Sequence, residues 1–280
     1  MSLQLALLGF GEAAQAFAGG AGWQARAFDV ERAPARRARL REAAQGAGVA
    51  LADDVAGALS GRPVVLSLVT AQSALEAARQ AAAHLAPGAL FLDMNSVAPD
   101  TKARAARAIE GAGARYADVA IMAPVHPAGR GVPLLVAGPA EAAAALGALG
   151  FTRVRHVGTA VGRAATIKLA RSVWVKGLEA LTAETLLAAD RADVLDEVAA
   201  SLGPGWLAEA DARLERMLAH GTRRAAEMAE AARLLESLGL DPAITRGTVE
   251  RQGSLGALAL DPVPSGLAGR LAALREGRLR

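Results

Sequence analysis

The amino-acid sequence predicts an α/β protein in which a doubly wound parallel sheet is followed by an all-helical domain. Between residues 3 and 157, short apolar runs of strand length alternate with alanine-rich helical stretches, and from residue 159 onward the sequence is helical in character. Strands and helices that alternate with short loops are typical of a parallel sheet covered by helices. We therefore expect a sheet domain at residues 1–158 and a helical domain at residues 159–280.

The elements expected in the first domain follow from apolar runs and the residues that interrupt them. A short apolar run bounded by turn-forming residues indicates a buried strand, and an alanine-rich stretch ended by a pair such as Pro87-Gly88 indicates a helix. Strands are expected at residues 3–8, 23–28, 49–51, 64–69, 89–93, 115–122, 134–137 and 152–157, and the clearest helices at 70–86, 98–111 and 140–149.

The second domain is expected to contain long helices. Residues 159–189 contain no proline and, after Gly162, only one further glycine, Gly177, so they predict one long helix. The breaks expected at Gly203-Pro204-Gly205, Gly221 and Gly239 then separate helices at 192–202, 205–218, 222–238 and 242–252. The tail from Leu255, with two prolines and an arginine-rich end, is expected to be loosely held.

The composition argues against several classes of protein. Hydrophobic residues make up 52% of the 280 residues, yet no run reaches the roughly 18 uncharged apolar residues of a membrane helix. The absence of cysteine excludes disulfides and thiolate sites, and no histidine pair has metal-ligand spacing. The net charge is +3, but the basic residues are dispersed and aromatic residues are only 3%, which disfavours nucleic acid. With a start that lacks a secretory leader, these features predict a cytoplasmic protein that binds neither nucleic acid nor membranes.

The N-terminal strand ends in a Gly-x-Gly-x-x-Ala motif formed by Gly9, Gly11 and Ala14. The first glycine suits a tight turn, the second lets the backbone approach a pyrophosphate, and the alanine allows close packing of helix and strand. The unpaired N–H groups of the first helical turn then face the anion. The sequence therefore predicts a dinucleotide site, whose expected cofactor contacts begin with Gly9, Phe10, Gly11, Glu12 and Ala13.

The strand expected at residues 23–28 ends in Asp29, about 20 residues after the first glycine, where a carboxylate holds the ribose hydroxyls of NAD. Arg32 begins a basic cluster that is either a solvated helix face or a partner for the 2′-phosphate of NADP. The sequence thus leaves NAD and NADP open. Val69 and Thr70 follow another strand and are further expected cofactor contacts.

A second polar turn lies at Asn95-Ser96, directly after the strand expected at residues 89–93. Both side chains could bind a hydroxyl, a carboxylate or the nicotinamide amide. Alternatively they form a capping turn before the helix that Pro99 opens. We include Asn95 among the candidate cofactor contacts and both residues among the candidate substrate contacts.

Lys168 lies among small and apolar residues early in the long helix, and Ser172 follows one turn later on the same face. Only three of the 31 basic residues are lysine: Lys102, Lys168 and Lys176. A partly desolvated lysine can release its proton at usable pH, whereas arginine cannot. Lys168 is therefore the candidate general acid/base. A surface position for Lys168 remains an alternative, and Lys176 is disfavoured because Glu179 offers it an ordinary ion pair.

These motifs resemble the β-hydroxyacid dehydrogenases. The resemblance rests on the first glycine motif, on Asp-x-Asn-Ser-x-x-Pro at residues 93–99 and on Gly-x-x-x-x-x-Lys at residues 162–168, and it covers roughly residues 3–190. The family includes 3-hydroxyisobutyrate and 6-phosphogluconate dehydrogenases, and the remaining segment resembles the short helical domain of a phosphogluconate-dehydrogenase-like branch. The resemblance implies a Rossmann domain, a helical domain that dimerises, an active site between them and Lys168 as the catalytic lysine.

Two departures from the family pattern concern the substrate. The family's Ser-Gly-Gly loop corresponds to Met122-Ala123-Pro124 here, and Pro124 has no N–H to donate. The family's asparagine one turn after the lysine is replaced by Ser172. Both changes disfavour a small hydroxycarboxylate, and His126 either replaces a lost polar contact or is an exposed loop residue. The candidate substrate contacts are Asn95, Ser96, Met122, Ala123, His126 and Ser172.

The function that fits these observations is an NAD(P)-dependent oxidoreductase that acts on a hydroxyl or carbonyl of a small molecule. Two alternatives remain: a reductase of C=N bonds, against which Lys168 counts, and a catalytically silent dinucleotide-binding regulatory protein. The alanine- and leucine-rich helices after residue 159 carry more apolar surface than a monomer easily buries. We therefore expect a homodimer formed through the C-terminal domain.

Overall fold

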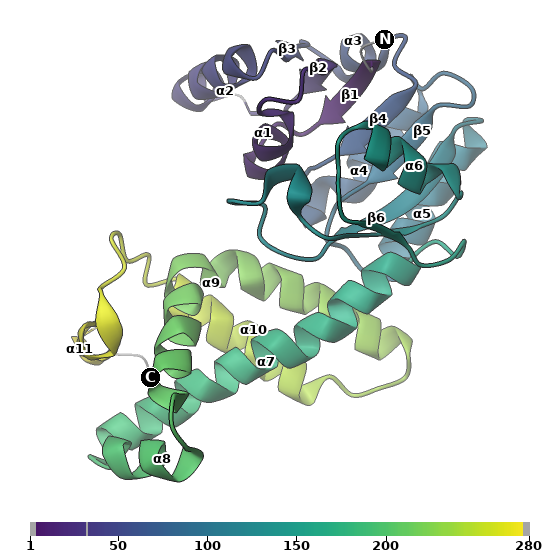
Figure 1. Ribbon diagram of the computed structural model, residues 1–280. Coiled ribbons are helices and arrows are strands. Elements are labelled where there is room, and N and C mark those ends of the chain that lie inside the picture. Colours follow the sequence, from purple (N-terminus) through teal and green to yellow (C-terminus); the bar gives the residue numbers. More distant parts are fainter. Residues whose placement is uncertain (1–3, 32, 277–280) are drawn as a thin grey trace. The chain divides into compact units, whose positions relative to one another are not determined.

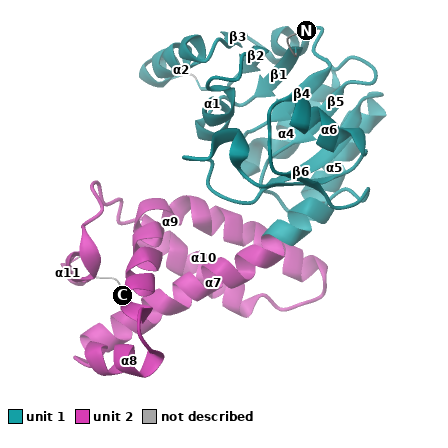
Figure 2. Ribbon diagram, in the orientation of Figure 1, with its two compact units in different colours: residues 1–168 teal, residues 169–280 magenta. Residues whose placement is uncertain are grey.

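The computed structural model describes residues 4–31 and 33–276. The chain divides into two compact units, residues 1–168 and 169–280 (Figure 2), which are described separately below. The division falls inside the long helix α7 (Arg163–Arg191), so that its first turns belong to unit 1 and the rest to unit 2.

Unit 1 is built on one eight-stranded sheet (Figure 1). Its strands are β1 (Gln4–Leu8), β2 (Gln24–Phe28), β3 (Ala50–Leu51), β4 (Val64–Ser67), β5 (Leu90–Asp93), β6 (Arg115–Ile121), β7 (Leu134–Ala137) and β8 (Val154–His156). The strand order is β3-β2-β1-β4-β5-β6-β7-β8, so the order in which successive strands are added reverses between β1 and β4. The predicted α/β class is confirmed.

The predicted parallel sheet has one antiparallel pair, near one edge. β7 pairs antiparallel with β6, and β8 pairs parallel with β7, so the last two strands run against the other six. The reason lies in the connection between β6 and β7, which contains only the 3₁₀ turn η2 (Gly129–Gly131) and no crossover helix. A parallel partner needs such a crossover, whereas a direct loop returns the chain alongside β6.

Successive residues of a strand point to opposite faces of the sheet. Both sets are apolar here, so helices cover both faces. Leu5 and Leu7 belong to one core and Ala6 and Leu8 to the other. The first core is closed by α1 (Glu12–Ala18), α2 (Pro34–Gly46) and α6 (Glu141–Ala148). The second is closed by α3 (Val55–Leu59), α4 (Ala74–Ala82) and α5 (Pro99–Gly111), with the 3₁₀ turn η1 (Ala71–Ser73) before α4.

Unit 2 is helical, as predicted, but it contains fewer breaks than expected. It comprises the rest of α7, α8 (Leu195–Leu202), α9 (Trp206–Ser237), α10 (Ala243–Gly256) and α11 (Gly266–Glu276). The break expected at Gly221 is wrong, because α9 runs through it without interruption. Gly221 serves packing instead: a Cβ there would lie 2.6 Å from the backbone nitrogen of Gly256 in α10.

The expectation of a loosely held tail is also wrong for the residues that the structure describes. Leu255 is fully buried, and α11 contributes Leu271 and Leu274 to the core formed with α7 and α9. Arg270 is buried beside Asp211 and Glu215 of α9, which anchors α11 electrostatically. Among the described residues, no helix has both the length and the apolar character needed to cross a membrane.

Candidate functional site

The loop after β1 combines a glycine that the fold requires with one that leaves space open. Gly9 has φ of +84°, and a Cβ there would lie 2.5 Å from the carbonyl oxygen of Leu68. Gly11 directly precedes α1, is exposed, and has no neighbouring atom within 4 Å of the place of a Cβ. Because the first N–H groups of a helix have no helical partner, the open space beside Gly11 suits an anionic group.

Asp29 follows β2 and ties its end to this loop. Its two carboxylate oxygens accept the backbone N–H groups of Phe10, at 2.8 Å, and Glu31, at 2.9 Å. A carboxylate oxygen accepts more than one hydrogen bond, so Asp29 retains capacity for a ribose hydroxyl. Arg32, the residue expected near a 2′-phosphate, lies outside the described residues.

Val69 and Thr70 follow β4, which lies beside β1 at the point where the strand order reverses. The Leu68 N–H donates to the carbonyl of Leu8 at 2.7 Å, which keeps the two strand ends together. The Val69 N–H donates to Asn95 Oδ1 at 2.7 Å, and the exposed Thr70 hydroxyl donates to Ser73 Oγ at 3.1 Å. Ligands of doubly wound sheets bind at this kind of crevice.

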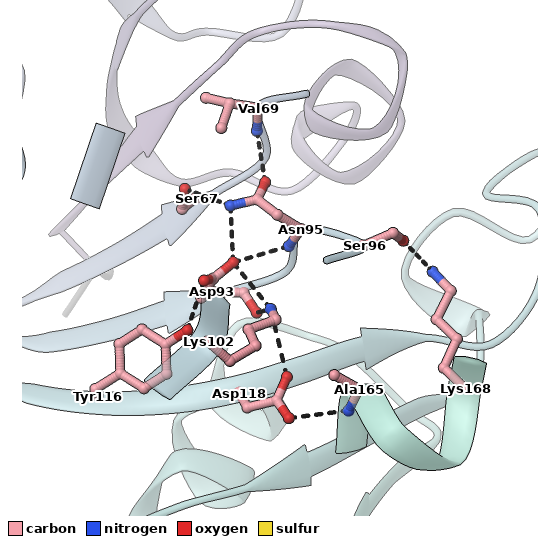
Figure 3. A network of polar contacts seen from close by, with 10 residues as sticks. All are labelled: Ser67, Val69, Asp93, Asn95, Ser96, Lys102, Tyr116, Asp118, Ala165 and Lys168. Carbon is pink, nitrogen blue, oxygen red and sulfur yellow. Dashed lines mark hydrogen bonds and ion pairs between the residues drawn. The ribbon is translucent and has the colours of Figure 1, made fainter. Parts of the chain in front are cut away.

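Asn95 points into the protein and holds neighbouring loops together. Its amide nitrogen donates to Ser67 Oγ at 2.9 Å and to Asp93 Oδ1 at 2.7 Å, while its oxygen accepts the Val69 N–H (Figure 3). The residue is buried, and both amide hydrogens are used within the protein. As a direct contact to cofactor or substrate, Asn95 stays a prediction.

A buried ion cluster of Asp93, Lys102, Asp118 and Tyr116 lies next to Asn95 (Figure 3). Lys102 is fully buried, and its Nζ lies 3.0 Å from Asp93 Oδ1 and 3.3 Å from Asp118 Oδ1. The Tyr116 hydroxyl donates to Asp93 Oδ2 at 2.5 Å. Burial, followed by the charge and the hydrogen bond of Asp93, raises the pKa of Tyr116 well above its ordinary value, so the phenol remains a donor.

Sequence reasoning missed this cluster, although a signal was present. Asp93 and Asp118 are acids within otherwise apolar strands, and Lys102 is one of only three lysines. Buried charges are rare unless they are paired, so an acid inside a buried strand indicates a partner elsewhere in the chain.

Lys168 lies at the edge of the sheet beside the turn that follows β5. Its Nζ donates to Ser96 Oγ at 2.5 Å (Figure 3). The helix start is fixed by Gly162, whose φ is +91° and whose Cβ would lie 2.9 Å from Cβ of Pro99, the first residue of α5. Ala164 and Ile167 pack against side chains of β6 and β7. The candidate base is therefore half-buried and held within unit 1.

The loop after β6 carries the candidate residues Met122, Ala123 and His126. Met122 is half-buried, and its N–H donates to the carbonyl of Pro133 at 2.9 Å, whereas Ala123 and His126 are exposed. Arg130, further along the loop, donates to the carbonyls of Phe17 and Gly19 and lies 5.5 Å above the Trp23 ring. The loop is thus attached to the end of α1.

In unit 2, Ser172 is buried on α7 one turn after Lys168. Lys176 pairs with Glu227 of α9 rather than with Glu179, which is instead held by Arg216 and Arg224. Within the described residues, no group of three or more acidic or histidine side chains could hold a metal ion.

The geometry defines a class of protein. A glycine turn after the first strand, an acid after the second, and open space at the first turn of α1 form the nucleotide-binding half of a Rossmann sheet. These residues fit a dinucleotide because Gly11 leaves the place of a Cβ empty and Asp29 is held beside the glycine loop.

Comparison with known proteins identifies the family. Residues 5–151 match the NAD binding domain of 6-phosphogluconate dehydrogenase, and residues 189–255 match a domain of unknown function. The chain therefore belongs to the family with the 6-phosphogluconate dehydrogenase type of NAD-binding domain, and its cofactor is NAD or NADP. The predicted resemblance is confirmed, whereas the individual site residues stay predictions.

Solved structures agree with this assignment. A conserved hypothetical protein from Sinorhizobium meliloti is 39% identical, with 99% of this chain and 97% of that one covered and a TM-score of 0.77. A conserved protein of unknown function, described as structurally similar to 3-hydroxyacid dehydrogenases, is 30% identical over 91% and 97% of the two chains, with a TM-score of 0.71. The 3-hydroxyisobutyrate dehydrogenase of Mycobacterium tuberculosis, 16% identical over 99% and 100% of the chains with a TM-score of 0.75, shares the fold.

Proposed function

We propose that the protein is an NAD(P)-dependent dehydrogenase or reductase of a hydroxyl or carbonyl group, with Lys168 as its general acid/base. The observation that carries the proposal is the 2.5 Å hydrogen bond from Lys168 Nζ to Ser96 Oγ. Because β1, β4 and β5 are parallel neighbours, their carboxyl ends meet at one edge of the sheet. This bond holds the Lys168 amine at the same edge as the glycine loop after β1.

The chemistry assigned to the residues is proton transfer and orientation. When bound beside the glycine loop, NAD(P) would supply the hydride chemistry, that is, removal of a hydride from the substrate carbon in oxidation or its return in reduction. The neutral Lys168 amine takes the proton of the substrate hydroxyl, and the ammonium gives it back to the carbonyl oxygen in the reverse direction. The Ser96 hydroxyl accepts a hydrogen bond from the amine and thereby orients it.

The loop after β6 affects which substrate the site would recognise. Pro124 has no N–H to bind a carboxylate, and the exposed His126 is the ionisable side chain in that part of the loop. We propose that binding of the substrate relies less on recognition of a carboxylate than binding of a small hydroxycarboxylate would. We also propose that Met122 and His126 contact the substrate.

We also propose NAD as the preferred cofactor. The Asp29 carboxylate lies beside the glycine loop, where it would accept hydrogen bonds from ribose hydroxyls. A 2′-phosphate at that position would meet a like charge, and Glu31 adds a second acid nearby.

The proposal is tested by binding and turnover in parallel. NADH and NADPH affinities are measured by fluorescence, and hydroxyacids, alcohols, aldehydes and imines are screened at 340 nm with each cofactor. Lys168→Ala and Lys168→Arg are expected to lower kcat by about 10²–10⁴-fold. Both variants should retain cofactor affinity within a factor of two to three, because Lys168 is not part of the glycine loop.

Arginine is the matched control because it keeps the positive charge but cannot release a proton. Undiminished turnover in Lys168→Ala would refute the assigned role. Clear cofactor binding by the wild type without turnover of any substrate in the screen would favour the regulatory alternative.

We further propose a homodimer formed through unit 2. Trp174 and Leu181 on α7 and Ile244 on α10 are 71%, 62% and 82% exposed, although they are large and apolar. Leu181 and Ile244 line a groove of about 490 Å³ between the two helices. An apolar surface of this kind is typical of an interface. A sedimentation mass of one 28.4 kDa chain at micromolar concentration would contradict the dimer, and Ile244→Glu is expected to dissociate it.

A further inference from the structure

We propose that Asp118 is a positioning residue that, through the buried ion cluster, sets the place of Lys168 relative to Ser96. The inference rests on the proposed function of Lys168 and adds a role for side chains that touch neither substrate nor cofactor. It starts from the hydrogen bond in which the Ala165 N–H donates to Asp118 Oδ2 at 2.9 Å (Figure 3).

Asp118 performs for α7 the task that an N-cap side chain normally performs. Ala165 is the third residue of α7, and its N–H is one of the helix donors that lack an intrahelical partner. Gly162, which precedes the helix, has no side chain that could accept this bond. A carboxylate from β6, 47 positions earlier in the chain, supplies the acceptor instead. The negative charge also interacts favourably with the positive end of the helix dipole.

The other end of the cluster holds the turn that carries Ser96. Asp93 Oδ1 accepts the backbone N–H of Asn95 at 3.0 Å and one side-chain N–H of Asn95 at 2.7 Å, which fixes the chain immediately before Ser96. Lys102 Nζ also donates to the carbonyl oxygen of Asp93 at 2.7 Å. The end of β5 is therefore held by its own carboxylate and by the Lys102 ammonium.

Lys102 links Asp93, at one end of the cluster, to Asp118, at the other. Its fully buried ammonium lies between the two carboxylates, at 3.0 Å from Asp93 and 3.3 Å from Asp118. Charges in a low-dielectric interior interact strongly, so this bridge resists displacement of one carboxylate relative to the other. One carboxylate fixes the turn before Ser96 and the other fixes the first turn of the helix that carries Lys168. The bridge thus sets the separation across which Lys168 reaches Ser96.

The cluster is suited to orientation more than to stability. Two carboxylates share one ammonium, and removing ions from water has a large cost that pairing only partly offsets. An apolar core at this position would hold the sheet together at least as well. A network that joins α7 to β5 and β6 is expected where an accurate helix position matters for the chemistry.

Asp118→Asn is the variant that tests the proposal, and Tyr116→Phe is its control. Asparagine is nearly isosteric, and Asp93 and Lys102 remain a matched ion pair, so the variant is expected to fold. Tyr116 is equally buried on β6, but its hydroxyl bonds Asp93 Oδ2, away from α7. Asp118→Ser is a second variant with a short uncharged acceptor, and circular dichroism checks that each protein is folded.

Two readouts do not depend on turnover. The first is amide hydrogen exchange in the first turn of α7, which is expected to quicken at least tenfold in Asp118→Asn and less than twofold in Tyr116→Phe. The second is reductive ¹³C-methylation followed by NMR. The chain has three lysines, of which Lys102 and Lys176 are buried, so the signal of half-buried Lys168 is assigned by its loss in Lys168→Arg. That signal is expected to move toward the position of free dimethyl-lysine in Asp118→Asn and to stay in place in Tyr116→Phe.

The third readout separates kcat from cofactor affinity. Asp118→Asn is expected to lower kcat at least tenfold while the Kd for NADH changes less than twofold. Wild-type exchange and a wild-type Lys168 signal in folded Asp118→Asn, or equal changes in Tyr116→Phe, would overturn the proposal. If the wild type lacks turnover, the proposed function fails, and the exchange and NMR readouts still decide whether Asp118 positions Lys168.

Discussion

Gly221 in α9 and Gly256 at the end of α10 bring their backbones into contact. A Cβ on Gly221 would lie 2.6 Å from the backbone nitrogen of Gly256, closer than real Cβ atoms approach such a group. The two helices of unit 2 are therefore held at a separation that only a pair of glycines permits. A glycine within a helix normally lowers its stability, so this one is retained for packing.

Gly221→Ala is expected to destabilise unit 2 by about 1–3 kcal/mol, because forced overpacking exceeds the gain of up to about 1 kcal/mol in helix propensity. Gly253→Ala in α10 is the matched control, since its Cβ would lie 3.7 Å from the Ala225 side chain, an ordinary contact. The control should be neutral or stabilising. Urea unfolding of both variants measures the difference, and equal stabilisation of the two would contradict the packing role of Gly221.

Gly11→Ala and Gly9→Ala are both expected to lower the affinity for NADH, but for different reasons. At Gly11 the Cβ meets no protein atom and φ is ordinary, so the melting temperature should change little while affinity for NADH falls at least tenfold. At Gly9 a positive φ and the approach to Leu68 should lower the melting temperature as well. Thermal melts and fluorescence titrations check both. Unchanged affinity in Gly11→Ala would mean that no pyrophosphate lies beside this residue.

Asp29→Asn is expected to shift cofactor preference toward NADP. The carboxamide can still accept one of the N–H groups that now hold the carboxylate, so the loop should keep its shape. The change removes a charge that repels a 2′-phosphate and weakens the acceptor for ribose hydroxyls. We expect the ratio of the Kd for NADPH to that for NADH to fall about tenfold, corresponding to about 1.4 kcal/mol. An unchanged ratio would exclude Asp29 from cofactor selection.

The stability of unit 2 is expected to depend on pH through Lys176. Burial lowers the pKa of the Lys176 amine from 10.5, and Glu227 opposes this only in part. Between the lowered value and 10.5 the unfolded chain binds more protons than the folded one, so the free energy of unfolding contributed by Lys176 rises with pH in that window. Below the window the full penalty of burying the charge applies.

The measurement compares the wild type with Lys176→Met, in which Glu227 retains its pair with Arg223. Urea unfolding at intervals from pH 7 to pH 10.5 should show the wild type gaining stability relative to the variant as pH rises. A constant difference across the range would show that Lys176 has no shifted pKa in the folded state.

Local patterns in the sequence determined most of the fold and the start of the site. Apolar runs and alanine-rich stretches placed the strands and helices of unit 1. The glycine motif and Asp29 indicated the dinucleotide site because the requirements for turns and helix starts are local. The same local reasoning misread Gly221, since a glycine that breaks a helix and a glycine that packs against another helix look alike in one dimension.

Only the tertiary structure decided the direction of β7 and the partners of the buried charges. It also decided the place of Lys168, whose amine meets the hydroxyl of Ser96, 72 residues earlier in the chain. These features depend on contacts between segments far apart in the sequence. A strand's direction follows from how the chain returns to the sheet, and a buried lysine finds its carboxylates only once the strands that carry them lie side by side.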